Sequence, residues 1–407
     1  AANPKAWTGS TKGLVKGEVV LVDMPQSEAD MDKYKGKLAG KIVLMPVTQQ
    51  YEISFDPLAF RYTDEELAEM ATDPRPGRHN YRRTSGGATM SREQMMKMRE
   101  LQQKFTKMIQ GEGALAIINT RGTFNVTNGT GAQYKVGDPE PTPEITLPLE
   151  DGGRMARLLK RGEKVEMELD LKHVFTNNQK INNVVAEIPG TDPKLKDEVV
   201  LIGAHLDSWH GGTGGADNSS GCVVMMEAMR IIKALGINPR RTIRIALWGG
   251  EEQGLYGSRG YLQNYLYKDG KKLPGYDKFA LYLNMDNGSG RFRGIYLEQN
   301  DMAKTFFKNW MEPIEDLGFK VLSPNSTGST DHEAFNTLGL PAYQFIQDAL
   351  EYRRTYHTIM DTYERLTMED LKIDACITAW LALCAANDNN KIPVKPGYPG
   401  LAKELRY

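Results

Sequence analysis

The sequence predicts an α/β fold in which a mostly parallel sheet is sandwiched by helices, preceded by a smaller unit rich in β-strands. From residue 183 onward, short apolar segments alternate with longer helical segments, and this alternation is typical of parallel sheets. Before residue 175 strand-like segments predominate, and the polar run Asn-Asn-Gln-Lys at 177–180 separates the two patterns. We therefore expect a first unit over residues 12–174 and a second over 175–407, with residues 1–11 as a leading segment.

The bulk composition is that of an ordinary globular protein and excludes several classes of partner. The chain has 407 residues, of which 40% are hydrophobic and 25% charged, and its net charge is −1. A chain so close to neutral has no electrostatic basis for binding nucleic acid or an anionic membrane surface. It contains no apolar run of about 18 residues, so we expect no membrane span. The cysteines form no CxxC pair and are expected to be small buried apolar residues: Cys222, Cys376 and Cys384.

In the first unit, apolar segments bounded by glycine and charged residues predict strands at 17–22, 40–45, 113–118, 143–147 and 164–174. Helices are expected at 91–110, where Ser91 is the N-cap residue, and at 150–160. The segment 48–90 is rich in Arg, Asp, Pro and Gly and is expected to be a long surface excursion. Apolar residues that recur every three or four positions in the first helix predict a core-facing stripe: Met95, Met98, Leu101, Phe105 and Met108.

In the second unit, the alternation of strands and helices is regular. Strands are expected at 183–188, 198–204, 242–247, 279–284 and 341–346. Helices are expected between and after them, at 219–235, 257–267, 302–317 and 367–386. The strand at 198–204 is short, apolar and rich in β-branched residues, as a strand buried on both faces should be.

Acidic residues and histidines follow most of these strands. The strand at 198–204 leads into His205 and Asp207, whose side chains point the same way because strand side chains alternate. A glycine-rich loop then leads to Asp217, just before a helix. The other candidates follow later strands: Glu251, Glu252, Asp286 and His357.

Each of these residues by itself is a common structural residue, such as a core histidine, a helix cap or a turn acid. Together they indicate a metal site, because parallel strands bring their C-terminal ends to one edge of the sheet. Carboxylates held close together raise one another's pKa, and a divalent cation removes that penalty. Mixed histidine and carboxylate ligands suit Zn²⁺, with Mn²⁺ or Co²⁺ as alternatives. The set exceeds what one tetrahedral zinc needs, which favours two ions about 3.5–4 Å apart.

Residues 183–385 resemble the M28 family of zinc peptidases, which includes bacterial leucyl aminopeptidases and glutamate carboxypeptidases. The matching pieces are HLD at 205–207, GADNSSG at 215–221, GEEQGLYGS at 250–258, NMD at 284–286, YHT at 356–358 and DT at 361–362. The resemblance implies the zinc-exopeptidase fold and two Zn²⁺ per chain. It implies that His205, Asp217 and Asp286 hold one metal, and that Asp217, Glu252 and His357 hold the other, so that Asp217 bridges the two.

The same resemblance assigns roles to residues that do not bind metal. Glu251 would be the general base, and Asp207 would stand behind His205 as a carboxylate–histidine–metal relay. His332, in STDHEAF at 329–335, would contact the substrate by hydrogen-bonding the tetrahedral intermediate. The aminopeptidases of the family carry a cis peptide after the bridging Asp, so we expect the peptide bond between Asp217 and Asn218 to be cis.

The first unit resembles the protease-associated (PA) domain that many family members carry as an insert. The pieces that carry this likeness are KGKLAGKIVL at 35–44, GALAIIN at 113–119 and TPEITLPLE at 142–150. Family members with this insert usually have about a hundred residues before it, so the resemblance leaves open a missing N-terminal segment or a homodimer. The chain begins without methionine and shows no signal peptide, which suggests removal of an upstream segment; the resemblance implies a secreted or periplasmic protein.

The function that the resemblance implies is metal-dependent exopeptidase activity, in which a water bridging two zinc ions attacks a peptide substrate. An aminopeptidase or dipeptidase is expected first, and a carboxypeptidase of the same family is the alternative. The choice depends on pocket residues that the sequence does not place, among them Asn287, Arg291, Arg353 and Arg354. Less favoured are a glutaminyl cyclase, which uses one zinc, and an inactive binding protein such as the transferrin receptor.

Overall fold

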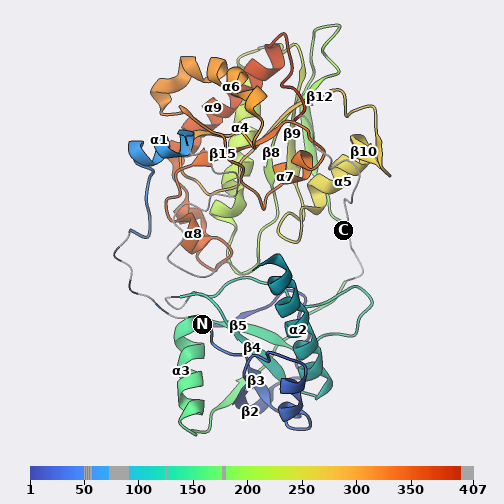
Figure 1. The fold of residues 1–407 in the computed structure, drawn as a ribbon, viewed down its shortest axis with the longest axis vertical. Coiled ribbons are helices and arrows are strands. Elements are labelled where there is room, and N and C mark those ends of the chain that lie inside the picture. Colours follow the sequence, from blue (N-terminus) through green and yellow to red (C-terminus); the bar gives the residue numbers. More distant parts are fainter. Residues whose placement is uncertain are drawn as a thin grey trace.

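The structure is a computed structural model that describes residues 1–395 except 50, 52, 54, 56, 73–90, 124–125 and 177–179. Two sheets, each with helices around it, form two units that lie one above the other in Figure 1. The fold is the expected mixed α/β arrangement with mostly parallel strands. Among the helices that the structure describes, none combines the length and apolarity that a membrane crossing requires.

The first sheet has six strands in the order β1-β5-β4-β3-β2-β6. Its inner strands run parallel, whereas β1 and β6 pair antiparallel at the two edges. The leading segment therefore contributes an edge strand, which the sequence does not predict because the strand has only two residues. The bounds are β1 (Asn3–Pro4), β2 (Val15–Leu21), β3 (Ile42–Leu44), β4 (Ala116–Thr120), β5 (Glu144–Leu147) and β6 (Glu166–Leu169).

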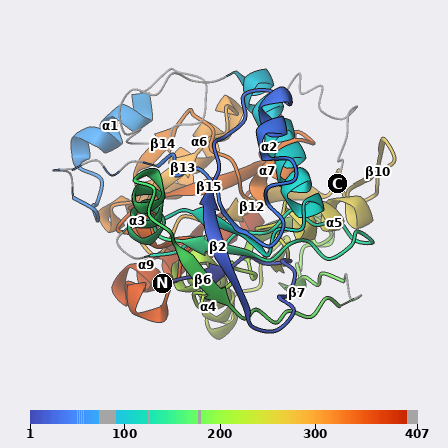
Figure 2. The same ribbon diagram turned by 90° about the horizontal axis from the view of Figure 1, so that it is seen from below.

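Two helices, α2 (Arg92–Gly111) and α3 (Leu149–Lys160), cover opposite faces of this sheet, and η1 (Ala29–Tyr34) lies beside α2 (Figure 2). The expected N-cap of α2 is confirmed, since the Ser91 hydroxyl accepts a hydrogen bond from the Gln94 N–H at 3.1 Å. Phe105 is fully buried, but Met98 is 47% exposed, so the predicted stripe is wrong at that position. Only the later part of α2, with Phe105 and Ile109, packs in the core of the first unit, so Met98 nearer its start stays exposed.

The expected excursion over 48–90 is in part a helix. Its segment α1 (Asp64–Thr72) packs Leu67 and Met70 against the second unit rather than lying free on the surface. Arg61, just before this helix, pairs with two buried carboxylates of the second unit, Asp348 at 2.9 Å and Asp370 at 2.7 Å. Residues 73–90 of the expected excursion lie outside the described residues.

The second sheet has seven strands in the order β14-β13-β15-β12-β8-β9-β7. The central strands β15, β12, β8 and β9 are parallel, whereas β7 pairs antiparallel with β9, and β13 antiparallel with β15. The bounds are β7 (Val184–Ile188), β8 (Val199–His205), β9 (Thr242–Trp248), β12 (Phe279–Asn284), β13 (Phe292–Tyr296), β14 (Val321–Ser323) and β15 (Ala342–Gln347). A small hairpin, β10 (Tyr267–Lys268) and β11 (Lys271–Lys272), stands apart from the sheet.

Helices cover both faces of the second sheet. One face packs against α4 (Ser220–Ala234), α6 (Lys304–Met311) and α9 (Met368–Asn387), and the other against α5 (Tyr256–Tyr265) and α7 (His332–Asn336). Strand β8 serves both cores, because Val200 and Ile202 point to the first face and Leu201 to the second. Cys222 is buried as expected, but Cys376 on α9 is exposed, which corrects that prediction.

The short elements of the second unit lie in its connections. They are η2 (Gly215–Ser219), η3 (Asp301–Ala303), η4 (Glu312–Leu317), α8 (Tyr352–Thr355) and η5 (Tyr363–Arg365). In Figure 1, α8 lies on the side of the second unit that faces the first. The C-terminal ends of the parallel strands thus open toward the boundary between the two units.

Candidate metal centre

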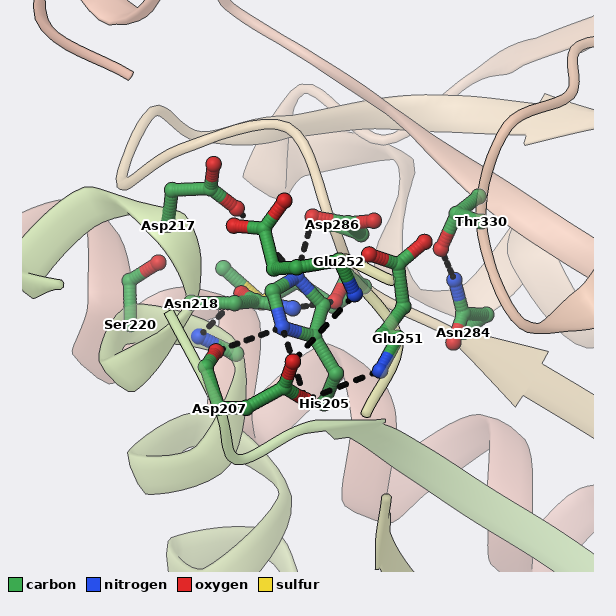
Figure 3. Close-up of polar contacts among 12 residues, drawn as sticks. His205, Asp207, Asp217, Asn218, Ser220, Glu251, Glu252, Asn284, Asp286 and Thr330 are labelled. Carbon is green, nitrogen blue, oxygen red and sulfur yellow. Dashed lines mark hydrogen bonds and ion pairs between the residues drawn. The ribbon is translucent and has the colours of Figure 1, made fainter. Parts of the chain in front are cut away.

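Most of the predicted polar residues meet at the C-terminal edge of the second sheet, and Figure 3 shows six of them: His205, Asp207, Asp217, Glu251, Glu252 and Asp286. His205 is the last residue of β8, Glu251 and Glu252 follow β9 after two glycines, and Asp286 comes two residues after β12. Two further side chains come from connections: Asp217 from η2, just before α4, and His357 from the loop after α8. Parallel strand direction therefore brings residues that are 152 positions apart in sequence to one place, as His205 and His357 show.

The five histidine and carboxylate side chains of the proposed ligand set form two groups that share Asp217. Nε2 of His205 lies 3.2 Å from Oδ1 of Asp217 and 3.1 Å from Oδ1 of Asp286. Nε2 of His357 lies 3.2 Å from Oδ2 of Asp217 and 2.9 Å from Oε2 of Glu252. The two oxygens of the Asp217 carboxylate thus face different histidines, which is the arrangement that a bridging ligand requires.

The donor set fits divalent cations on the evidence of its own polar atoms. Oε1 of Glu252 is buried and accepts no hydrogen bond among the described residues. Ligand atoms of His205, Asp217 and Glu252 lie within 4.8 Å of one another, as do those of His205, Glu251 and Asp286. Buried carboxylate oxygens without donors are costly unless a cation satisfies them.

The pKa shifts of the carboxyl groups at the site also indicate that it fits a divalent cation. Burial, reinforced by the charge of Asp286, raises the pKa of Glu251 to about 10, and burial also raises the pKa of Asp286 and Glu252. Burial opposes ionisation of Asp217 as well, but hydrogen bonds from His205 and His357 hold its pKa below the usual range. Without metal, the site must therefore keep protons that a divalent cation would replace.

The affinity of the site for a divalent cation is expected to rise with pH. In the metal-free protein burial lowers the pKa of His357, but hydrogen bonds to Asp217 and Glu252 raise it more, to about 9. A histidine that binds metal must be a neutral imidazole, so below this pKa the ion bound beside His357 displaces the proton from that residue. The apparent dissociation constant for Zn²⁺ should fall about tenfold per pH unit for one displaced proton, between about pH 6 and 8. Titration of metal-free protein in chelator-buffered zinc measures this, and a pH-independent constant would contradict it.

Asp207 occupies a different place from the one expected. Its carboxylate accepts hydrogen bonds from the backbone N–H groups of Glu251 at 3.0 Å and Glu252 at 3.2 Å. The Nδ1 atom of His205 instead lies 2.8 Å from the backbone carbonyl of Asp207, and its distance to the carboxylate is 3.9 Å. The expected carboxylate relay is therefore corrected: the carbonyl orients the imidazole, and the carboxylate holds the loop that carries Glu251 and Glu252.

The carboxylate of Asp361 holds the backbone at Asp217. The sequence pattern predicts no role for Asp361. Asp361 accepts hydrogen bonds from the backbone N–H groups of Ala216 at 2.6 Å and Asp217 at 3.1 Å. The peptide bond between Asp217 and Asn218 is cis, as the family resemblance predicted. The amide of Asn218 donates to the Met285 carbonyl at 2.8 Å and so ties η2 to the end of β12. The sequence feature that could have indicated this role is the DT pair at 361–362, which is one of the pieces that match the family.

His332 does not lie where a substrate contact requires. Its side chain is fully buried in α7, and its Nε2 atom lies 3.2 Å from Oε1 of the buried Glu298. The expected role in binding the substrate is therefore corrected to a structural one. The two residues before it are closer to the site: the Asn284 amide donates to the Thr330 hydroxyl at 2.8 Å, and burial raises the pKa of Asp331 to about 7. A short helix turns its successive side chains about 100° apart, so a motif alone does not tell which one faces the site.

Comparison with known proteins places the region that holds this site in a family. Residues 183–382 match the model described as peptidase family M28. Over 285 residues the chain is 30% identical to carboxypeptidase Q of Mus musculus, which covers 69% of this chain and 58% of that protein. It is 31% identical over 175 residues to leupeptin-inactivating enzyme 1 of Streptomyces exfoliatus, covering 42% of this chain and 37% of that protein. The chain thus spans little more than half the length of the carboxypeptidase Q relative.

Two solved structures have a similar fold. A peptidase M28 precursor from Shewanella amazonensis is 23% identical, with a TM-score of 0.63 over 97% of this chain and 79% of that chain. BSAP, a zinc aminopeptidase from Bacillus subtilis, is 20% identical, with a TM-score of 0.59 over 98% of this chain and 82% of that chain. At these identities the likeness concerns the fold alone. The family match covers all the converging histidines and carboxylates, and residues 183–382 of this chain belong to peptidase family M28.

Proposed function

We propose that this protein is an exopeptidase that holds two zinc ions and hydrolyses a terminal peptide bond, acting as an aminopeptidase or dipeptidase. The observation that carries the proposal is the Asp217 carboxylate, whose two oxygens lie 3.2 Å from two different histidines. His205, Asp217 and Asp286 would hold one ion, and Asp217, Glu252 and His357 the other. Bound zinc would supply Lewis acidity toward the substrate carbonyl and lower the pKa of water; Mn²⁺ or Co²⁺ could serve in its place.

Glu251 is the residue that would move the proton. It is buried beside the ligand groups, and its backbone is held by the Asp207 carboxylate at 3.0 Å. As general base, its carboxylate takes a proton from the attacking water and then gives it to the nitrogen of the leaving amine. Burial, and after it the charge of Asp286, raises the pKa of Glu251 in the metal-free site, so the carboxyl group there readily holds a proton. Positive charge nearby would lower that pKa toward the working range.

The pairing of two arginines favours recognition of a free amine over recognition of a free carboxylate. Two of the arginines that the sequence nominates for binding a carboxylate already have acidic partners: Arg291 lies 3.3 Å from Asp370, and Arg354 lies 3.9 Å from Glu351. A substrate carboxylate is best held by an arginine that can offer it two parallel N–H groups. The alternative, a carboxypeptidase, is favoured by the 30% identity to carboxypeptidase Q.

Substrate panels on zinc-loaded protein test this proposal. We expect hydrolysis of amino acid amides and dipeptides with a free N-terminus, and none of their N-acetylated forms, because acetylation removes the charged amine. A chelator should abolish the activity, and added zinc should restore it. Cleavage of N-acetylated peptides that have a free C-terminus would replace the aminopeptidase by the carboxypeptidase. Inactivity on every substrate after zinc loading would refute the proposal.

We further propose that residues 12–174 form a protease-associated unit, with residues 175–407 as the peptidase unit. The support is the separate six-stranded sheet with its own two cores, one on each face.

A further inference from the structure

The loop that carries His357 has an unusual backbone. His357 has a φ of +58°, in the left-handed region that only a few per cent of residues other than glycine adopt, histidine somewhat more often than most. Such a conformation persists only where surrounding contacts impose it. Around it, bonds within the second unit shape the following turn: the Thr358 hydroxyl donates to the Thr355 carbonyl at 2.6 Å and accepts from the Met360 N–H at 3.0 Å. The carbonyl of His357 itself has a partner from elsewhere.

That partner belongs to the first unit. The Gly129 N–H donates to the His357 carbonyl at 2.7 Å, and the Ile359 N–H donates to the Thr127 carbonyl at 3.2 Å. Asn128 and Thr358 form the antiparallel bridge between these two bonds. The segment 127–129 therefore acts as a short strand that pairs with the carbonyl of the strained residue and with the N–H two residues after it.

The close approach of this segment to residues 209–210 requires a glycine at position 129. A Cβ atom at position 129 would lie 2.8 Å from Cβ of Trp209 and 2.9 Å from the His210 carbonyl oxygen. The Trp209 ring contacts His357 on one side, with ring centroids 6.3 Å apart, and Trp7 of the first unit on the other, at 5.9 Å. The glycine-rich loop before Asp217 and the His357 loop are thus both held by the first unit.

Two of the other proposed ligands, His205 and Asp286, do not depend on the first unit in this way. Within the described part of the chain, the contacts of His205 and Asp286 come from the second unit alone: Asp207, Asp217, Cys222 and Thr330. His205 and Asp286 extend from neighbouring strands of a fully buried sheet. The two proposed cation positions are therefore supported unequally.

We propose that the segment 127–129 of the first unit is a positioning element for His357, so that occupancy of the cation position formed by Asp217, Glu252 and His357 depends on contact between the units. This inference rests on the proposed function, which supplies the two cations. Gly129 acts through the backbone of His357 and touches neither substrate nor cation. The position formed by His205, Asp217 and Asp286 depends less on this contact, because it shares with it only the loop that leads to Asp217.

Zinc titration of metal-free Gly129→Ala tests the inference. We expect two ions to bind, the first with little change in affinity and the second about tenfold more weakly, which corresponds to losing one well-formed hydrogen bond. Gly111→Ala is the matched control, because a Cβ there meets no atom within 4 Å, and it should bind like the wild type. Trp7→Ala serves as a second variant that adds no clash, and it should weaken the same ion.

A double-mutant cycle identifies which ion is affected. His357→Ala should retain only one tight ion, and adding Gly129→Ala to it should leave the affinity for that ion unchanged, because the residue being positioned is gone. Unchanged binding of both ions in Gly129→Ala and Trp7→Ala, or an equal loss of both, would overturn the inference. A wild-type protein that binds fewer than two ions would instead overturn the two-zinc proposal on which the inference rests.

Discussion

Replacement of Glu251 by glutamine is expected to lower kcat by about 10²–10⁴-fold while zinc content stays at the wild-type level. The amide has the size of the carboxylate and can still accept a hydrogen bond, but it cannot take up a proton. The side chain is buried and its backbone N–H is held by Asp207, so the substitution should not move the loop. Steady-state kinetics on a free-amine substrate, together with metal analysis of the same samples, measure the two quantities.

A surface glutamate provides the matched control for this change. Glu369 lies in the same unit, is 79% exposed and pairs only with the exposed Lys372, so Glu369→Gln should leave kcat unchanged. If Glu251→Gln kept wild-type turnover with full zinc, the role of general base would have to pass to another group. Loss of zinc together with turnover would instead assign Glu251 to the ligand set.

Replacement of Asp217 by asparagine is expected to reduce bound zinc from two ions to one or none, and turnover to background. Each carboxylate oxygen faces a different histidine, and an amide keeps only one oxygen and no negative charge. Because a ligand that binds only the folded state stabilises it, zinc should raise the Tm of the wild type more than that of the variant. Metal analysis after dialysis and thermal unfolding with and without zinc measure this.

The control for Asp217→Asn is an exposed aspartate just before β8, at the opposite end of that strand from His205. Asp197 is 65% exposed and lies 3.0 Å from the exposed Lys278, so Asp197→Asn should keep two zinc ions and full activity. Two tightly bound ions in Asp217→Asn would refute a bridging role for Asp217.

The central parallel strands of the second unit could be predicted from local sequence. The strands that end at His205 and before Asp286 are almost continuous apolar runs, and the strand that ends at Trp248 is apolar apart from Thr242 and Arg244, as is typical of a buried parallel sheet. Once the strands are parallel, their ends share one edge, so the meeting of His205, Asp217, Glu252 and Asp286 follows from the sequence pattern. What such a pattern does not encode is which way a side chain in a short connection points.

Asp207 and His332 illustrate this limit. Asp207 lies two residues after His205, so alternation predicts a shared direction, but two backbone N–H groups from the loop after β9 take its carboxylate. His332 sits in a motif of the family, yet α7 turns it into the core against Glu298. In both cases the deciding partner comes from a segment more than 30 residues away in sequence.

The sequence by itself determined the α/β architecture, the edge of the sheet where the polar residues gather and the chemical type of that cluster. These properties depend on local periodicity and on the rule that parallel strands end together. Only the tertiary structure decided that the segment 127–129 meets the strained backbone of His357 and that Arg61 and α1 dock on the second unit. Such contacts form between segments without a shared periodic pattern, because they depend on how two separately folded sheets come to face each other.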